Sequence, residues 1–173
     1  MSGTRKGLIV GAIQIALVLS LGAKLLSDRI TRPRGWALAQ VYDPDMPIRG
    51  RYLSERLQLP AVGFSYQPPQ EYVDEWVANR RWAYLEVDEG QVRAYARGSG
   101  AGAWIYLHRN ADGSLVAFTE EPVAVFISET AEIPVLKTGQ ELWVEVTLPT
   151  KGPPRPIRIG LKTNGVLTPV KVD

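Results

Sequence analysis

Apolar and polar positions divide this chain into one long apolar run and a series of short alternating segments. The run covers residues 7–26, GLIVGAIQIALVLSLGAKLL, in which only Gln14 and Lys24 are strongly polar. Twenty helical residues at about 1.5 Å each reach roughly 30 Å, the thickness of the hydrocarbon core of a bilayer. Lys24 lies near one end, where its ammonium group can reach the interface. The pattern therefore predicts a single transmembrane helix over about residues 7–26.

Two other interpretations of this run stay open. A cleaved signal peptide also starts with basic residues, but its apolar core is usually about 7–15 residues long and precedes a small-x-small cleavage site. The best such site is Ser20-Leu21-Gly22, and the apolar residues continue past it to Leu26, which favours an uncleaved anchor. A buried helix of a soluble domain is the weakest alternative, because the run lacks the polar face of a surface helix.

The rest of the chain alternates between apolar and polar residues with a period of two, which is typical of β-strands. The clearest alternation covers residues 141–148, and Asn164-Gly165 between two such segments is a strong hairpin signal. We expect Pro60 to end one strand and residues 98–102, which are rich in glycine, to form a flexible loop. The expected strands cover residues 36–42, 49–59, 81–87, 91–97, 103–109, 114–119, 123–128, 141–148, 157–162 and 166–172.

One short helix is expected between the second and third of these strands. Pro69 suits a first helical turn, three acidic residues follow it, and Arg80 and Arg81 stand at the end. Roughly eight to ten strands joined by tight turns predict an all-β domain, either an antiparallel barrel or a sandwich with one short helix. Residues 1–34 are thus expected to be the membrane anchor and connector, and residues 35–173 the β-rich globular domain.

Charge is distributed unevenly between these two parts. Residues 1–34 hold six Lys or Arg and one acid, whereas residues 35–173 hold fourteen Lys or Arg and seventeen acids. A mildly acidic globular domain argues against nucleic acid as a partner, because such proteins carry a basic patch on the folded domain. The basic residues around the apolar run are instead expected to contact lipid headgroups at the membrane interface; they are Arg5, Lys6, Lys24, Arg29, Arg32 and Arg34.

The orientation of the anchor is less clearly indicated. More positive charge follows the apolar run than precedes it, which by the positive-inside rule favours a cytoplasmic globular domain. However, a short amino-terminal tail before an apolar run is typical of export signals, and long domains cross the membrane largely regardless of their charge. The absence of cysteine is compatible with an oxidising compartment. We therefore predict an extracytoplasmic globular domain.

No residue pattern points to catalysis, a metal or a cofactor. His108 is the only histidine and there is no cysteine, so a metal site would lack its usual nitrogen and sulfur ligands. Asp43 and Asp45 flank a proline and are best explained by a turn. A serine–lysine pair was considered with Lys137 as the base, but no serine lies in an activating context. The sequence therefore predicts a protein without intrinsic catalysis, without a metal and without a cofactor.

Two regions carry a family resemblance. Residues 36–59, WALAQVYDPDMPIRGRYLSERLQL, place an Asp-Pro turn shortly before Arg49-Gly50-Arg51-Tyr52-Leu53. This arrangement resembles the GDYXXLXY family of membrane-anchored bacterial proteins, and segments 125–129, 139–146, 152–154 and 156–162 are similar to the closing hairpins of that family. Gly50 and Tyr52 match the family's G-x-Y core. Arg51, Glu55 and Leu57 replace its acid, leucine and final tyrosine, so no role of that acid is transferred.

The resemblance implies a single-pass protein of the bacterial inner membrane that works beside multi-span membrane proteins. It makes Arg49, Gly50, Arg51 and Tyr52 the predicted binding residues. The favoured hypothesis is an accessory or assembly module that binds a membrane or envelope partner, with the bilayer as its second partner. We expect Trp143 and Tyr95 among its exposed aromatic residues.

The alternative hypothesis is a hydrolase or a small-ligand-binding domain whose site forms only in three dimensions. Its candidate residues would be Arg51, Tyr52, Arg80, Arg81 and His108. A pocket with convergent polar groups would favour this alternative.

Overall fold

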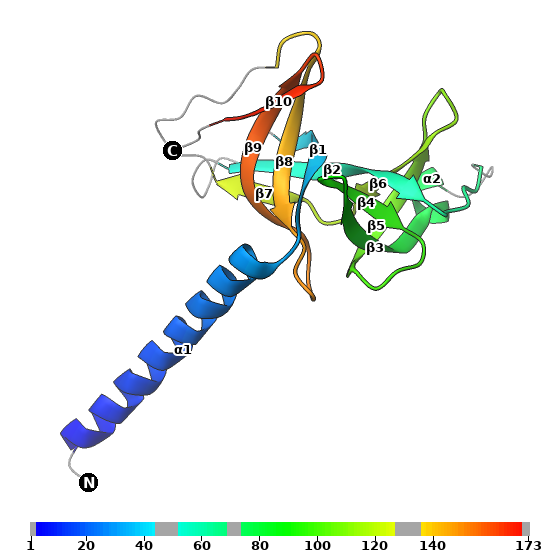
Figure 1. The fold of residues 1–173 in the computed structure, drawn as a ribbon. Helices are drawn as coiled ribbons and strands as arrows, with labels where there is room; N and C mark the ends of the chain where they lie inside the picture. The colour runs from blue at the N-terminus through cyan, green and yellow to red at the C-terminus, as the bar shows by residue number, and fades with distance from the viewer. Residues whose placement is uncertain (1–2, 44–51, 69–73, 127–135, 171–173) are drawn as a thin grey trace. The chain divides into compact units, whose positions relative to one another are not determined.

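The computed structural model describes residues 3–43, 52–68, 74–126 and 136–170. The chain divides into two compact units, residues 1–32 and residues 33–173. The first unit contains helix α1, Gly3–Thr31, and the second, which we call the head, contains the strands (Figure 1). All-β architecture behind one long amino-terminal helix is thus confirmed.

Helix α1 is longer than the apolar run. Its segment Arg5–Thr31 is long and apolar enough to cross a membrane: an 18-residue stretch within it has a mean hydropathy of 2.1, and no residue of that stretch is buried. We expected residues 27–35 to be a connector, but the helix continues to Thr31. Polar contacts explain the extra turn: Thr31 donates a hydrogen bond to the Ser27 carbonyl, and Arg32 pairs with Asp28 at 3.4 Å. Pro33 cannot continue the helix.

The described part of the head contains ten strands and one short helix, α2. Their bounds are β1 Arg34–Asp43, β2 Tyr52–Val62, α2 Glu75–Ala78, β3 Arg80–Asp88, β4 Gln91–Tyr95, β5 Ala101–Arg109, β6 Leu115–Thr119, β7 Val123–Phe126, β8 Gln140–Thr147, β9 Arg155–Thr163 and β10 Val166–Pro169. Each strand expected from the sequence therefore exists, with ends shifted by a few residues.

Strand β2 connects the two halves of the head. Its first half pairs with β1 and β7, and its second half pairs with β6 and β4. The pairings β2–β6–β5–β3–β4 return to β2, so these five strands form a closed ring, while β8, β9 and β10 extend the sheet from β1. Figure 1 shows β2 running through both groups of strands. Most pairs are antiparallel, as expected, but β4 pairs briefly in parallel with β1 and β2.

Pro60 does not end β2, contrary to our expectation. The β1 pairing stops at Gln58 and the β4 pairing starts at Ala61, so Pro60 lies in the gap between these two neighbours. On the other side it is the last β2 residue paired with β6. Few ladder hydrogen bonds therefore depend on the N–H that proline lacks.

The core fills the inner face of this sheet. Residues 55, 57 and 59 of β2 are fully buried and alternate with partly exposed neighbours. Five other strands add large apolar side chains to the same core. These buried side chains include Leu85, Val92, Ile105, Leu107, Val144 and Ile159. The period-two pattern of the sequence is therefore the buried face of the observed sheet.

Three further expectations need correction. The helix predicted from Pro69 to Arg81 is described only as Glu75–Ala78, because Asp74 caps it, residues 69–73 lie outside the described part and Arg80 starts β3. Trp143 is 8% exposed instead of forming a surface aromatic, because β8 is covered on both faces. The expected loop of residues 98–102 is shorter, because Ala101 and Gly102 already belong to β5, and a Cβ on Gly100 would lie 2.3 Å from the carbonyl oxygen of Leu85.

A chain that starts at Pro33 is expected to be soluble, monomeric and mainly β, because the head buries its own core and α1 contributes nothing to it. Arg34 pairs with Thr147, and the Pro33 carbonyl accepts a hydrogen bond from Leu148, so both residues must be kept. Circular dichroism and size-exclusion chromatography check this. A chain that starts at Ala39 loses every described β1–β8 pair and should aggregate. Equal behaviour of the two chains would contradict the assignment of β1 to the core sheet.

Candidate functional site

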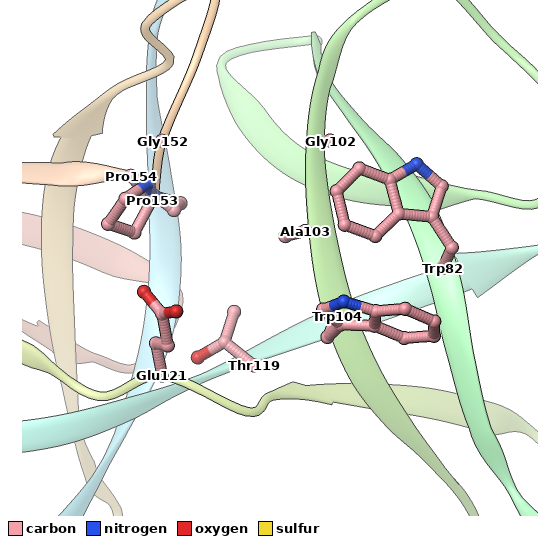
Figure 2. Close-up of a pocket in the computed structure, with 9 residues that line it drawn as sticks. All are labelled: Trp82, Gly102, Ala103, Trp104, Thr119, Glu121, Gly152, Pro153 and Pro154. Carbon is pink, nitrogen blue, oxygen red and sulfur yellow. The ribbon is translucent and has the colours of Figure 1, made fainter.

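A cleft of about 170 Å³ lies between β5 and the loop that joins β8 to β9. One wall is formed by the β3–β5 surface, with Trp82, Gly102, Ala103 and Trp104. The opposite wall is Gly152, Pro153 and Pro154, and the end of β6 adds Thr119 and Glu121. Figure 2 shows the Glu121 carboxylate projecting toward the two prolines, and the Ala103 methyl group pointing into the gap from β5. We call this the aromatic cleft.

Two tryptophans border the cleft from the outer face of β3 and β5, on the opposite side of β5 from Glu121 and the prolines (Figure 2). Trp82 and Trp104 are directly opposite each other on β3 and β5, with ring centroids 5.3 Å apart and ring planes at 79°. They are 46% and 43% exposed. A Cβ on Gly102 would lie 2.1 Å from the Trp82 ring, so the Trp82 ring takes the space of the side chain that glycine lacks. This cross-strand packing fixes the position of the ring.

A charged network supports Trp104 from beside the cleft. The Arg80 guanidinium lies 3.9 Å from the centroid of the Trp104 ring and donates hydrogen bonds to both oxygens of Glu120, the shortest 2.8 Å long. Tyr106 donates a further bond of 3.0 Å to Glu120. These donors, Arg80 foremost, lower the pKa of Glu120, so it stays ionised and holds Arg80 in place. Glu120 is therefore a half-buried, paired carboxylate.

Glu121, the next residue, differs from Glu120. It is exposed and makes no hydrogen bond or ion pair with any residue that the structure describes. The cleft therefore combines an unpaired carboxylate with two indole rings and two prolines. Such a set can bind a ligand by charge and by apolar contact, but it contains no nucleophile beside a base.

His108 lies outside the cleft, on the far half of β5. Its Nδ1 is 3.3 Å from Oε1 of Glu75, and the same oxygen accepts a hydrogen bond of 2.7 Å from Tyr66. The hydrogen bond that the Tyr66 hydroxyl donates to Glu75 is the main cause that raises the pKa of Tyr66. Asn79 of the same region ties Gln67 to α2 through its buried side chain. These contacts attach α2 and the segment before it to β5, which is a structural role.

Glu55 is a second unusual carboxyl group. It is 0% exposed on the inner face of β2, between Val41 of β1 and Val123 of β7, and neither of its oxygens has a hydrogen-bond partner in the described part of the chain. Burial raises the pKa of Glu55 to about 7 from 4.5. At neutral pH the group is therefore close to half protonated. Its only signal in the sequence is an acid in register with Leu57 and Leu59.

The predicted binding residues are not tested by this geometry. Arg49, Gly50 and Arg51 lie outside the described residues, and Tyr52 starts β2 with a side chain that is not described. Arg80 lies beside the aromatic cleft, while Arg81 and His108 lie elsewhere on β3 and β5. Within the described ranges, no group of three His, Cys, Asp or Glu side chains could hold a metal ion.

The residues of the cleft were missed in the sequence, although a signal existed. Trp82 and Trp104 stand at polar-face positions of two predicted strands, and Gly102 precedes Trp104 by two residues. Two large aromatics on the outward face of a pair of strands are unusual enough to mark a surface site. The sequence does not show that Pro153 and Pro154, which follow Trp104 by about fifty residues, lie close to β5.

No protein-family model matches this sequence, and neither a curated protein nor a solved structure matches it. The resemblance to the GDYXXLXY family therefore stays a prediction, and function has to be argued from the geometry of the chain itself.

Proposed function

We propose that this chain is a membrane-anchored accessory module that binds a membrane or envelope protein and has no catalysis of its own. The observation that carries the proposal is α1. Its apolar side chains are exposed over the length of a bilayer core. Such a surface is stable in lipid or against other membrane helices, and costly in water.

The resemblance described above supports a single-pass position in the bacterial inner membrane. Within this proposal the head is extracytoplasmic, and Arg5, Lys6, Lys24, Arg29, Arg32 and Arg34 lie near the headgroups. The extra helical turn agrees with this, because it contains Asp28, which pairs with Arg32 just beyond the helix, and such polar side chains suit the interfacial region.

The head also offers aromatic surface for a partner. Trp76 of α2 is 41% exposed and packs edge-on against Tyr106, while Trp82 and Trp104 form the exposed pair described above. Partly exposed tryptophan and arginine are the residue types that most often contribute binding energy at protein interfaces. The support for a binding module is therefore an anchor together with exposed, rigidly packed aromatic side chains.

The test is an affinity pull-down of the full-length chain, tagged at its carboxy terminus, from gently solubilised native membranes. We expect a stoichiometric membrane or envelope protein to be recovered. A matched chain in which α1 is replaced by an unrelated single-span helix shows whether α1 or the head makes the contact. A Trp76→Ala variant then tests the aromatic surface. Recovery of the chain alone from several mild detergents would contradict the accessory role.

The aromatic cleft favours a second candidate, a small-ligand-binding function for the head. The two functions are compatible, because a membrane-anchored module can carry a ligand site.

A further inference from the structure

Another cavity of the head, of about 240 Å³, lies on the outer face of the sheet where three strands separate. β1 pairs with β2 no further than Leu38 and Gln58, whereas β4 starts beside β1 at Gln91 and reaches β2 only at Ala61. Pro60 borders the gap between these strands. We call this the fork cavity. Its polar lining residues are Gln58, Gln91, Glu141 and Lys162.

The lining side chains of the fork cavity share one face of the sheet. Leu38 of β1 is opposite Gln58 of β2 on one side and opposite Trp143 of β8 on the other. Glu141, two residues before Trp143, is opposite Lys162 of β9. Paired residues, and residues two apart on one strand, point to the same face. These five side chains therefore all point outward, away from the core.

Trp143 positions the two charged groups of the cavity. Its Nε1 donates a hydrogen bond of 2.9 Å to Oε2 of Glu141, and the Lys162 ammonium lies 4.5 Å from its ring centroid. The ring is buried and covered by Lys162, so it is no stacking surface for a ligand. Glu141 and Lys162 make no ion pair with each other or with any other described residue. The cavity therefore presents one carboxylate and one ammonium group, both held by the same indole.

Charges beside the cavity are balanced by partners outside it. Three charged residues stand two positions from a lining residue on the same face, and each interacts with opposite charge elsewhere. These interactions are Arg56 with Glu120, Arg93 with Asp88 and Glu89, and Glu145 with Arg158. Within the cavity Glu141 and Lys162 cancel. Charge complementarity therefore favours a ligand without net charge.

The polar side chains keep hydrogen-bonding capacity that the protein does not use. The half-buried side chain of Gln91 makes no hydrogen bond with any described residue, and that of Gln58 makes one, with Gln40 at 3.1 Å. Glu141 uses only one of its two oxygens. A carboxylate accepts hydrogen bonds, an ammonium group donates them and an amide does both. A hydroxyl group also does both, so this set suits a ligand with several hydroxyl groups.

Size and apolar lining limit the ligand further. The volume of about 240 Å³ is below the roughly 300–1,000 Å³ of pockets that hold drug-sized molecules, so the cavity suits one small ring. Leu38, Pro60 and Val116 add apolar contact between the polar groups. A pyranose sugar ring carries hydroxyl groups on its rim and C–H groups on its faces. It therefore matches the lining in charge, size and polarity.

We propose that the fork cavity binds a single uncharged pyranose ring, with its hydroxyl groups on the four polar side chains and a C–H face against Leu38 and Val116. This assignment goes beyond the accessory function and does not depend on it, because every contact lies within the head. The ring belongs either to a free monosaccharide or to the end of a glycan. The chemistry of recognition is the same in both cases.

The test is titration of the isotope-labelled full-length protein with methyl α-D-glucopyranoside, followed by nuclear magnetic resonance. The protein is held in phosphatidylglycerol nanodiscs, because the headgroup of a maltoside detergent is itself built of glucose. The readout is the indole N–H signal of Trp143, which is identified by its shift in Glu141→Gln, where the acceptor of that N–H changes. We expect a saturable shift with a Kd in the millimolar range, and unchanged signals from Trp76 and Trp82.

Two substitutions and two matched controls locate the binding site. Gln91→Met removes one amide and keeps the length of the side chain, so binding should weaken about fivefold. Lys162→Met keeps the chain beside Trp143 without the ammonium group and should cause a similar loss. The controls Gln67→Met and Lys151→Met change exposed residues outside the cavity and should bind like the unchanged protein. Circular dichroism verifies folding, and because the two test positions lie on different strands, either one alone tests the site.

Comparison compounds separate a sugar ring from other ligands. Cyclohexanol has a six-membered ring with one hydroxyl group and should bind far more weakly; equal binding would overturn the proposal, because apolar shape alone would then be selected. A Trp143 shift with glycine but not with the glucoside would also overturn it, since Glu141 and Lys162 would then select a zwitterion. The methyl galactopyranoside and mannopyranoside test other hydroxyl arrangements. Absence of a saturable shift with all three sugars on folded protein would refute the proposal.

The source of the ring is decided with maltotriose, which contains the same sugar within a short chain. Binding of maltotriose at least as tight as that of the methyl glucoside would support the end of a glycan as the ligand. Exclusion of maltotriose, with the methyl glucoside still bound, would support a free monosaccharide. The accessory function is read by the pull-down, so failure of either test leaves the other result intact.

Discussion

Glu55→Gln is expected to stabilise the head by about 3 kcal/mol at pH 8 and to have almost no effect at pH 4. The carboxyl group is 0% exposed, has no hydrogen-bond partner in the described part of the chain, and has a pKa raised by burial to about 7. A shift of one pKa unit corresponds to about 1.4 kcal/mol, so a rise from 4.5 to about 7 gives a penalty of this size.

The direction of this pH dependence follows from the protonation of Glu55 in the folded and the unfolded protein. Below pH 4.5 Glu55 is neutral in both the folded and the unfolded protein, and its charge costs nothing. Between pH 4.5 and about 7 folding takes up a proton, so the free energy of unfolding falls as pH rises. Above about pH 7 the folded protein holds a buried carboxylate and the penalty is complete. The gain from Glu55→Gln should therefore grow with pH over this window.

Urea unfolding of the full-length protein in detergent at pH 4, 6 and 8 measures the effect. All five tryptophans lie in the head, so their fluorescence reports on it alone. Glu89→Gln is the control, because Glu89 is exposed on a turn and should change stability little at any pH. A gain from Glu55→Gln that is the same at pH 4 and pH 8 would rule out ionisation as its origin.

Gly100→Ala is expected to destabilise the head by about 2 kcal/mol or more. A Cβ at this position would lie 2.3 Å from the carbonyl oxygen of Leu85 and 2.9 Å from Cγ of Glu86. The first contact is with backbone, so the start of β5 would have to move away from β3, where Ala101 pairs with Leu85. Overpacking of this kind typically costs about 1–3 kcal/mol.

The comparison that isolates this clash is Gly113→Ala. Gly113 has a φ of +86° with nothing within 4 Å of an added Cβ, so alanine there meets conformational strain but no collision. That strain is worth about 1 kcal/mol. Urea unfolding should therefore rank Gly100→Ala as the more damaging change. The reverse order would mean that the segment before β5 can shift freely, as the sequence first suggested.

Local pattern was sufficient to locate nearly all the elements of this protein. The apolar run of residues 7–26 required a helix with an exposed apolar surface, and alternation required strands such as β8 and the β9–β10 hairpin. These features depend on the periodicity of neighbouring side chains, which a sequence shows directly. The predictions for Pro60 and Trp143 were wrong because tertiary contacts override the local pattern at these two positions. Pro60 is tolerated because β2 changes partners there, and Trp143 is buried because β8 is covered on both faces.

The sequence by itself therefore determined a long apolar helix followed by an all-β head. Only the tertiary structure decided which residues form a site. The aromatic cleft joins Trp82, Trp104 and Glu121 to Pro153 and Pro154. Pairing of β3 with β5 and the path of the β8–β9 loop bring them together. The same holds for Glu55, whose burial depends on β1 and β7 lying on either side of β2. Strand order arises from the packing of the whole core, so no local pattern encodes it.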